Sequence, residues 1–326
     1  MNHTTDRRAT LLHTWICQQY EVKENSFSAV SGDASFRRYF RFIAKHADGK
    51  DNVSLIAVDA PPELENSQPF IDVACLLEKN NIPVPKIYQQ DLKQGFYIQQ
   101  DFGDTLLLDI LNAHSSDALY KQAMHYILDI QKVSTEHLPL YDSQLLQKEM
   151  NLFSDWFIKK HLNLTLSTGD NVHIQTCFKL LEANALEQPQ VFVHRDYHSR
   201  NLMVLDDNSL GIIDFQDAVK GPITYDLVSL LRDCYIAWPQ MNIDQWLKHF
   251  YQKLNCEYTL EQFTRWFDLM GVQRHLKATG IFCRLNYRDH KSSYLNDIPR
   301  TLNYIVDTSK KYSELSELNK ILSKLS

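Results

Sequence analysis

A stretch near residue 200 carries three polar side chains whose types and spacing suit phosphoryl transfer. Asp196 closes a His194-Arg195-Asp196 triplet, Asn201 follows five positions later, and Asp214 follows thirteen positions after that. Transfer of a phosphoryl group to a hydroxyl needs a base near the acceptor oxygen and oxygen ligands for magnesium on the nucleotide phosphates. Magnesium is often held by only one or two carboxylates, with phosphate oxygens and water. We therefore expect Asp196 to be the catalytic base, and Asn201 and Asp214 to be Mg²⁺ ligands.

Three short strands are expected to position these side chains. Apolar residues at 191–193, 202–205 and 210–213 predict the strands, and the polar residues 206–209 predict a tight turn. Such a hairpin returns Asp214 towards Asn201. Each residue alone has an ordinary explanation, because Asp and Asn favour turns and helix caps. Their joint spacing matches the protein-kinase pattern H-R-D-x-x-x-x-N followed by D-F, and this match favours the catalytic interpretation.

On these residues the chain resembles the aminoglycoside phosphotransferase-like branch of the protein-kinase-like fold, whose members phosphorylate hydroxyl groups of small molecules. The resemblance continues through GPITYDLVSLLRDCY, where it implies that Asp226 braces the catalytic loop. An acid favoured by the dipole of a helix start is an equal alternative. The resemblance also implies that His194 and Arg195 support the loop. It implies an α+β bilobal fold, with an antiparallel-sheet nucleotide-binding lobe over residues 1–102 and a mostly helical lobe over residues 103–326.

Several stretches look closer to one bacterial group within that family. They include SGDASFRRYFR, VDAPPE and GIFCRLNYRDHKSSYLNDIPR, and together they run from Ser31 to Arg300. This group phosphorylates the anomeric hydroxyl of N-acetylmuramic acid and N-acetylglucosamine during peptidoglycan recycling. The resemblance implies ATP and Mg²⁺ as cofactors and an amino sugar as substrate. Two alternatives stay open: a kinase for another small alcohol, such as an aminoglycoside, choline or homoserine, and a catalytically silent nucleotide-binding sensor.

The phosphates of the nucleotide are expected near the start of the chain. Strands predicted over 27–31, 36–43 and 53–58 surround Ser31-Gly32-Asp33-Ala34-Ser35, whose small residues would let backbone N–H groups approach the triphosphate. A plain hairpin turn explains this segment about as well. Kinases usually carry a phosphate-binding lysine on the next strand, but that strand ends at Asp59 with no lysine. Arg37, Arg38 and Arg41 lie on the strand that leaves this segment, and one of them, with Arg38 the first candidate, could bind phosphate instead. Exposed strand arginines are an equal alternative.

Two further binding regions are predicted. Gln100, Asp101 and Phe102 end a predicted strand and resemble the hinge at which adenine binds. For the acceptor pocket the candidates are His198, Arg200, Arg232, Asp233 and Arg288. A surface or interhelix salt bridge is the alternative role for each of them. Arginine would suit the carboxylate of a muramyl lactate, whereas a polycationic acceptor would call for acidic side chains.

Composition excludes several classes of partner. The net charge of −6 and the pI near 6.1 argue against nucleic acid, whose binding proteins carry a clustered positive surface. The sequence contains no apolar run long enough for a signal peptide or a membrane span, so we expect a cytoplasmic protein with no membrane partner. Six widely spaced cysteines without a C-x-x-C motif predict free thiols. We expect a monomer that binds a small-molecule substrate.

Apolar periodicity predicts the remaining elements. Helices are expected over 7–20 and 68–79, and strands over 86–90 and 95–100. Beyond residue 103 the pattern is helical, with helices predicted over 105–113, 117–133, 142–161, 172–186, 223–236, 243–254 and 260–286 and in the charged terminal stretch.

Overall fold

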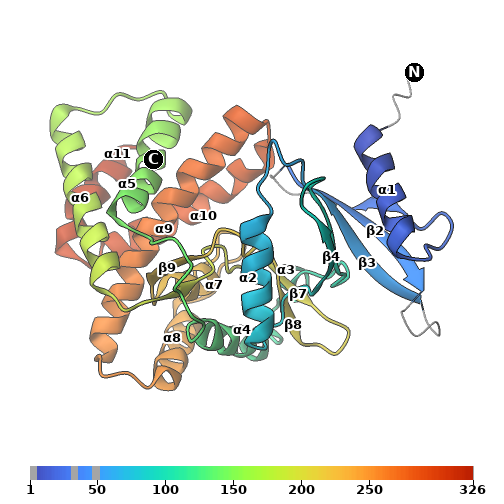
Figure 1. The fold of residues 1–326 in the computed structure, drawn as a ribbon. Helices are drawn as coiled ribbons and strands as arrows, with labels where there is room; N and C mark the ends of the chain where they lie inside the picture. The colour runs from blue at the N-terminus through green and yellow to red at the C-terminus, as the bar shows by residue number, and fades with distance from the viewer. Residues whose placement is uncertain (1–5, 31–35, 46–51, 326) are drawn as a thin grey trace. The chain divides into compact units, whose positions relative to one another are not determined.

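The computed structural model describes residues 6–30, 36–45 and 52–325, and Figure 1 shows its fold. The chain forms two compact units. The first comprises Met1–Thr105 and Met203–Gln216, and the second comprises Leu106–Leu202 and Asp217–Ser326. The hairpin that carries Asp214 therefore belongs to the first unit, although it follows the catalytic loop of the second unit in sequence.

The first unit is built on a five-stranded antiparallel sheet with the strand order β1-β2-β3-β5-β4. The strands are β1 (Ser28–Val30), β2 (Arg38–Lys45), β3 (Asn52–Asp59), β4 (Ile87–Asp91) and β5 (Phe96–Gln100). Each overlaps a predicted strand. Since side chains alternate between the two faces of a strand, each face of the sheet has its own set of residues.

The helix α1 (Arg7–Gln19) packs on one face of this sheet. Its residues Leu12, Trp15 and Ile16 share a buried cluster with Phe40 and Phe42 of β2. The cluster also contains Leu55, Ala57, Phe96 and Ile98 from the neighbouring strands. Apolar residues two positions apart along β2, β3 and β5 thus point towards α1.

The opposite face carries the helix α2 (Gln68–Lys79), which begins and ends where the sequence predicted. Phe70 of α2 packs on Tyr97 of β5, with ring centroids 5.3 Å apart, and stacks on Phe215 at 4.9 Å. Phe215 follows the predicted hairpin, which consists of β7 (Leu202–Val204) and β8 (Leu210–Ile212). This face therefore brings α2 to the segment that contains Asp214.

The second unit is mostly helical, as predicted. Its helices are α3 (Leu107–Ile110), α4 (Ser116–Ile130), α5 (Ser143–Leu152), a π-helix (Phe153–His161), α6 (Thr168–Glu187), α7 (Tyr225–Leu231), α8 (Gln240–Leu254), α9 (Leu260–Asp289), α10 (Ile298–Ser309) and α11 (Ser316–Leu325), with 3₁₀ turns at Ser292–Asp297 and Ser313–Leu315. β6 (Gln190–Val193) pairs with β9 (Val219–Pro222) in an antiparallel ladder.

The long helix α9 forms the centre of this unit, because α5, α6, α7 and α10 all pack on it. A Cβ atom at Gly280 of α9 would lie 2.3 Å from the backbone carbon of Leu152, so only glycine permits this close approach. The predicted single helix over 142–161 changes from α to π directly after Leu152. The change of helix type therefore coincides with this close contact on α9.

Two elements of the second unit were not predicted. Lys220, Gly221 and Pro222 interrupt any strand pattern in β9, which forms because β6 offers it a partner. The helix α10 is rich in β-branched residues, which lower helix propensity, yet it buries Ile298, Thr301, Ile305 and Thr308. That spacing is one helical face, and α10 packs with it on α9.

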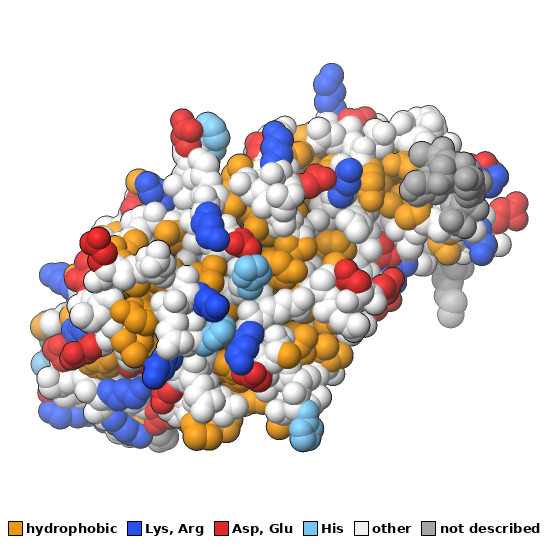
Figure 2. All heavy atoms as spheres, turned by 90° about the horizontal axis from the view of Figure 1, so that it is seen from below, with side chains coloured by type: hydrophobic (Ala, Val, Ile, Leu, Met, Phe, Trp, Pro, Cys, Tyr) orange, Lys and Arg blue, Asp and Glu red, His pale blue; other side chains and the backbone are white. Residues whose placement is uncertain are grey.

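Acidic and basic residues are present in similar numbers in the sequence, and both are spread over the surface (Figure 2). On the face shown in Figure 2, basic and acidic side chains are mixed with hydrophobic ones, and neither sign of charge forms a continuous cover. None of the helices in the described ranges is long and apolar enough to cross a membrane. The six cysteines all lie within the described residues and are unpaired.

Candidate active site

The predicted catalytic loop follows β6 directly, and Asp226 holds its first two residues. The backbone N–H groups of His194 and Arg195 donate to the two carboxylate oxygens of Asp226, at 2.7 and 3.0 Å. Asp226 lies in the first turn of α7 and is buried. Burial raises the pKa of Asp226 to about 6, although His194 and the two N–H groups oppose this shift. The residue is thus both a first-turn acid and a partner of the loop backbone.

The loop turns around the carbonyl oxygen of Asp196. That oxygen accepts the backbone N–H of His198 at 3.0 Å and the side-chain amide of Asn201 at 2.9 Å. Burial alone would raise the pKa of the Asp196 carboxyl, but electrostatic interactions with Lys277, His198, Arg274 and Arg195 outweigh burial and lower it to about 2. Asp196 is therefore a carboxylate at neutral pH, the form that accepts a hydrogen bond from a hydroxyl group.

A buried charge network behind the loop was not predicted. Glu149 of α5 forms ion pairs with Arg195 and with Lys277 of α9, the latter at 3.1 Å. The hydroxyl of Tyr141 also donates to Glu149, and Lys277 donates to the hydroxyl of Tyr225 at 3.1 Å. Buried lysine and glutamate are rare unless paired. The signal for this network in the sequence is Lys277, a lysine on the buried part of α9.

The second half of the loop is fastened by Asp233. Its Oδ2 accepts the backbone N–H of Ser199 at 2.9 Å and the Ser199 hydroxyl at 2.5 Å, and its Oδ1 accepts the N–H of Tyr235 at 2.8 Å. The guanidinium of Arg200 lies 3.7 Å from the centre of the Tyr235 ring, and the imidazole of His198 contacts the same ring edge-on at 5.1 Å. The Tyr235 ring thus contacts both Arg200 and His198, two of the predicted acceptor residues.

His198 has one further property that bears on the acceptor pocket. Within the described residues, its Nδ1 atom is buried and has no hydrogen-bond partner. Burial lowers the pKa of His198, although Asp233 and Asp196 oppose the shift. A neutral imidazole with an unused nitrogen can bind a polar group of a ligand.

The other two predicted acceptor residues have structural partners. Arg232 is buried, forms an ion pair with Asp268 of α9, and donates to Thr308 of α10 at 3.3 Å. Arg288 is exposed and pairs with its neighbour Asp289 at 2.8 Å. These contacts match the salt-bridge alternatives stated for both residues.

In the first unit, Asp214 lies two residues after the end of β8, the strand that was expected to lead to it. It has a positive φ of 66°, a conformation that Asp tolerates better than most residues. The side-chain amide of Gln216 donates to Asp214 Oδ1 at 2.6 Å. Gln216 in turn accepts a hydrogen bond from Arg37 at 3.3 Å. Asp214 is therefore linked through one glutamine to a buried arginine.

The predicted hinge is also held by an arginine. Asp101 accepts two hydrogen bonds from Arg41, at 2.6 and 2.9 Å, and one from the Ser54 hydroxyl at 2.5 Å. Burial would raise the pKa of Asp101, but Arg41 and Ser54 lower it below its usual value. Gly103 has a φ of +79°, which glycine adopts readily.

Two more residues of this predicted site can be placed. Gln100 ends β5 and pairs with Leu55 of β3. The Phe102 ring packs so closely on Gly211 of β8 that a Cβ atom there would lie 2.5 Å away.

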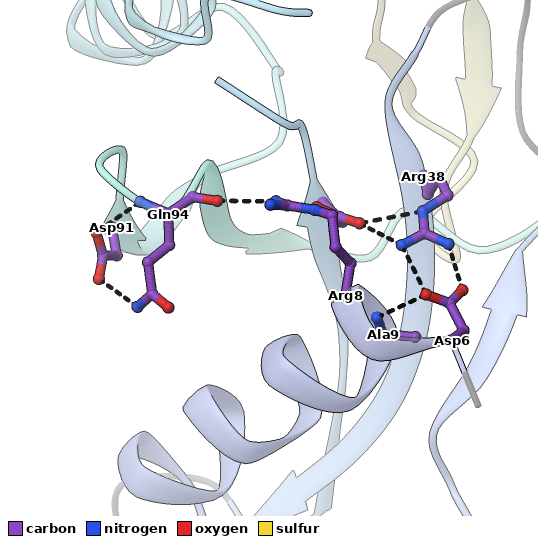
Figure 3. Close-up of polar contacts among 7 residues, drawn as sticks. Asp6, Arg8, Ala9, Arg38, Asp91 and Gln94 are labelled. Carbon is purple, nitrogen blue, oxygen red and sulfur yellow. Dashed lines mark hydrogen bonds and ion pairs between the residues drawn. The ribbon is translucent and has the colours of Figure 1, made fainter. Parts of the chain in front are cut away.

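The predicted phosphate contacts have different outcomes. Ser31, Gly32, Asp33, Ala34 and Ser35 lie outside the described residues. Arg38 is described, and its Nε donates to Asp59 at 3.0 Å, while Arg8 of α1 donates to the other oxygen of Asp59 at 2.8 Å (Figure 3). Arg38 also pairs with Asp6, which caps α1 through the N–H of Ala9. Asp59, which ends the strand where a lysine was sought, is fully buried between two arginines.

The two proposed metal ligands come one from each unit. The amide nitrogen of Asn201 donates to the carbonyl of Asp196, so a cation would be bound through its amide oxygen. Asp214 offers a carboxylate. Each is a hard oxygen donor, the kind of ligand that magnesium takes alongside phosphate and water.

Comparison with known proteins identifies the family of the chain. Residues 26–265 match the family described as the phosphotransferase enzyme family. Over 98% of its length the chain is 40% identical to the N-acetylmuramate/N-acetylglucosamine kinase of Pseudomonas putida, covering 97% of that protein. The protein of the same name from Pseudomonas aeruginosa is 41% identical, with 94% of this chain and 90% of that protein covered, and the one from Neisseria meningitidis is 38% identical, with 98% and 96% covered.

Solved structures resemble the chain in fold. The choline kinase LicA from Streptococcus pneumoniae has a TM-score of 0.62 at 14% identity, with 93% of this chain and 100% of that chain covered. The aminoglycoside phosphotransferase APH(2'')-Ib has a TM-score of 0.59 at 16% identity, with 91% and 98% covered. The predicted α+β protein-kinase-like fold is thus confirmed, and the chain belongs to the phosphotransferase enzyme family.

Proposed function

We propose that the chain is an ATP-dependent sugar kinase that phosphorylates the anomeric hydroxyl of N-acetylmuramic acid and N-acetylglucosamine. The observation that carries the proposal is the 40% identity over nearly the whole length to a kinase named for these two sugars. Membership of the phosphotransferase family implies the use of ATP. We also propose Mg²⁺ as the cation, a cytoplasmic monomer as the working form, and peptidoglycan recycling as the context.

In the proposed reaction, Asp196 accepts a hydrogen bond from the anomeric hydroxyl and then its proton. The sugar oxygen forms a bond to the γ-phosphorus of ATP, the bond to the β,γ-bridging oxygen breaks, and ADP leaves. Asn201 and Asp214 would hold magnesium, which when bound neutralises charge on the phosphates. Asp226 and Asp233 fasten the loop backbone on either side of Asp196, so the carboxylate is oriented before substrate binds.

For the acceptor, we propose that Arg200 and His198 face the sugar. Both lie in the loop between Asp196 and Asn201, and both rest on the Tyr235 ring. A guanidinium can pair with the lactate carboxylate of N-acetylmuramic acid. Arg232 and Arg288, which have their own acidic partners, are assigned structural roles in this proposal.

The test is phosphoryl transfer from Mg-ATP to each of the two sugars, with the position of the phosphate read by ³¹P NMR. A 1-phosphate from either sugar supports the proposal. Turnover only with choline, homoserine or an aminoglycoside would replace the sugar by another alcohol. ATP binding without turnover on any acceptor would favour the silent sensor.

A further inference from the structure

The chain lacks the strand lysine that usually binds the nucleotide phosphates, and three arginines lie near the start of β2. Each of these arginines pairs with different acidic residues within the first unit. Arg38 pairs with Asp59 and Asp6, Arg41 pairs with Asp101 and Asp104, and Arg37 pairs with Glu65. Their partners decide which of them can replace the lysine.

Arg38 lies on the face of the sheet that packs on α1. It is opposite Asp59 in the β2–β3 ladder, and its guanidinium lies over Phe40, a member of the α1 cluster. Arg8 of α1 pairs with the same carboxylate, and Figure 3 shows Arg8 and Arg38 side by side. Asp214 is linked to the other face, because its neighbour Phe215 stacks on Phe70 of α2. Arg38 and Asp214 are therefore on opposite sides of the sheet.

Arg37 is on the same side as Asp214. Its guanidinium lies 5.0 Å from the centre of the Phe70 ring, donates to Glu65 just before α2 at 2.9 Å, and donates to Gln216 at 3.3 Å. Gln216 then donates to Asp214 at 2.6 Å. Arg37 is 4% exposed, whereas the side chain of its partner Glu65 is 22% exposed. The buried guanidinium of Arg37 is thus paired with the Glu65 carboxylate. One side chain, that of Gln216, links it to Asp214, the proposed metal ligand.

We infer that Arg37 binds the β- and γ-phosphates of ATP in place of the strand lysine, with Glu65 as the carboxylate that positions it. The inference rests on the proposed kinase function. Asp214 would hold the magnesium ion that accompanies the ATP phosphates, so these phosphates would lie close to Asp214. Guanidinium presents five N–H donors in a rigid fork and binds phosphate while it keeps a carboxylate partner. A purely structural Arg37–Glu65 pair is the competing explanation.

The decisive experiment measures binding of ATP, ADP and adenosine by calorimetry to the wild type and to the variant Arg37→Met. Loss of a charge-assisted contact to phosphate should weaken ATP and ADP about tenfold to a hundredfold and leave adenosine unchanged. Arg7→Met, which removes an exposed arginine of α1, is the matched control and should bind all three as the wild type does. Arg38→Met tests the rival directly, since a phosphate-selective loss in that variant alone would overturn the inference. Equal weakening of adenosine in Arg37→Met would show a structural role.

A second set of variants separates binding from folding. Arg37→Met leaves Glu65 unpaired, so the double variant Arg37→Met/Glu65→Gln is compared with it by thermal unfolding. If only the single variant is unstable, the double variant must still show the loss for ATP and ADP. Arg37→Lys keeps the charge without the fork and should recover part of the ATP affinity; no recovery of ATP affinity by lysine would count against a phosphate contact.

These measurements need no acceptor, so they also distinguish the two possible failures. Phosphate-selective loss in Arg37→Met together with inactivity towards both sugars would refute the proposed acceptor and keep Arg37. Turnover of the sugars with unchanged ATP affinity in Arg37→Met would refute Arg37 and keep the proposed function.

Discussion

The carboxylates that hold the predicted catalytic loop and those on the sheet of the first unit have different partners. In the second unit, the buried carboxylates of Asp226 and Asp233 accept backbone N–H groups of the catalytic loop. In the first unit, Asp59 and Asp101 accept hydrogen bonds from arginine side chains that are partly exposed. A carboxylate on backbone amides fixes the path of a loop, whereas an arginine pair can be exchanged for another partner. The comparison indicates a loop after β6 whose path is fixed by buried carboxylates, and arginine pairs in the first unit that are open to solvent and salt.

The largest effect is expected from Asp196→Asn. The substitution keeps the shape of the side chain and removes the base, so kcat should fall about a hundredfold to ten-thousandfold. The loop contacts use the Asp196 carbonyl and should persist, so the thermal unfolding midpoint should stay close to that of the wild type. Steady-state kinetics and thermal unfolding measure the two effects. Full turnover in this variant would remove Asp196 from the mechanism.

The next largest effect is expected in the charge network behind the loop. Glu149→Gln leaves Arg195 and Lys277 buried without their carboxylate, and breaking a buried pair costs about 3 to 5 kcal/mol. Chemical denaturation measures the loss of unfolding free energy. The control is Asp155→Asn, which removes the acid of the exposed pair with Lys159 and should cost less than about 1 kcal/mol. Equal losses in the two variants would mean that burial of the Glu149 network contributes nothing.

The pH dependence of kcat should reflect the titration of Asp226 and not that of Asp196. Asp196, with a pKa of about 2, stays ionised over the usual assay range, whereas Asp226 has a pKa of about 6. Protonation of Asp226 weakens its hold on the loop N–H groups, so kcat should fall as pH drops below about 6. Asp226→Asn imitates the protonated form, and we expect low activity without this acidic limb. An acidic limb that persists in Asp226→Asn would assign it to another group.

Asp226 also makes a prediction for stability. Its pKa in the folded chain lies above its ordinary value of 3.8, so folding favours the protonated form. The contribution of Asp226 to stability is therefore complete below pH 4, decreases up to about pH 6, and is constant above that. The difference in unfolding free energy between wild type and Asp226→Asn should follow this course.

The sequence predicted the parts of the site that lie close together along the chain. Asp196, Asn201 and Asp214 belong to one strand, loop and hairpin series, whose local pattern is set by alternating apolar runs and turn residues. The same holds for the strands of the sheet and for α2. Local signals are sufficient where neighbouring residues determine the element.

The partners of these residues could not be predicted in this way. Glu149 and Lys277 are 128 positions apart in the sequence. Their contact is evident only from the packing of α5 on α9. Which of Arg37 and Arg38 binds phosphate depends on the face of the sheet that each side chain occupies. The sequence shows that neighbouring residues alternate between faces, but it does not show which face packs on α1. The helix α10 forms despite its β-branched residues because α9 covers its apolar face.

The smallest effect is expected on the α1 face of the sheet, where Arg38→Gln breaks the pair with Asp59. The Arg38 side chain is 39% exposed, and Arg8 still pairs with Asp59 in the variant, so the loss of unfolding free energy should be about 1 kcal/mol or less. Salt screens exposed pairs, so this loss should shrink further at about 1 M salt, whereas the loss in Glu149→Gln should not. Denaturation of both variants at low and high salt makes the test. A loss in Arg38→Gln that is large and independent of salt would show that the Arg38–Asp59 pair of the first unit is as shielded as the Glu149 network of the second, and the contrast between salt-sensitive arginine pairs and a fixed loop would fail.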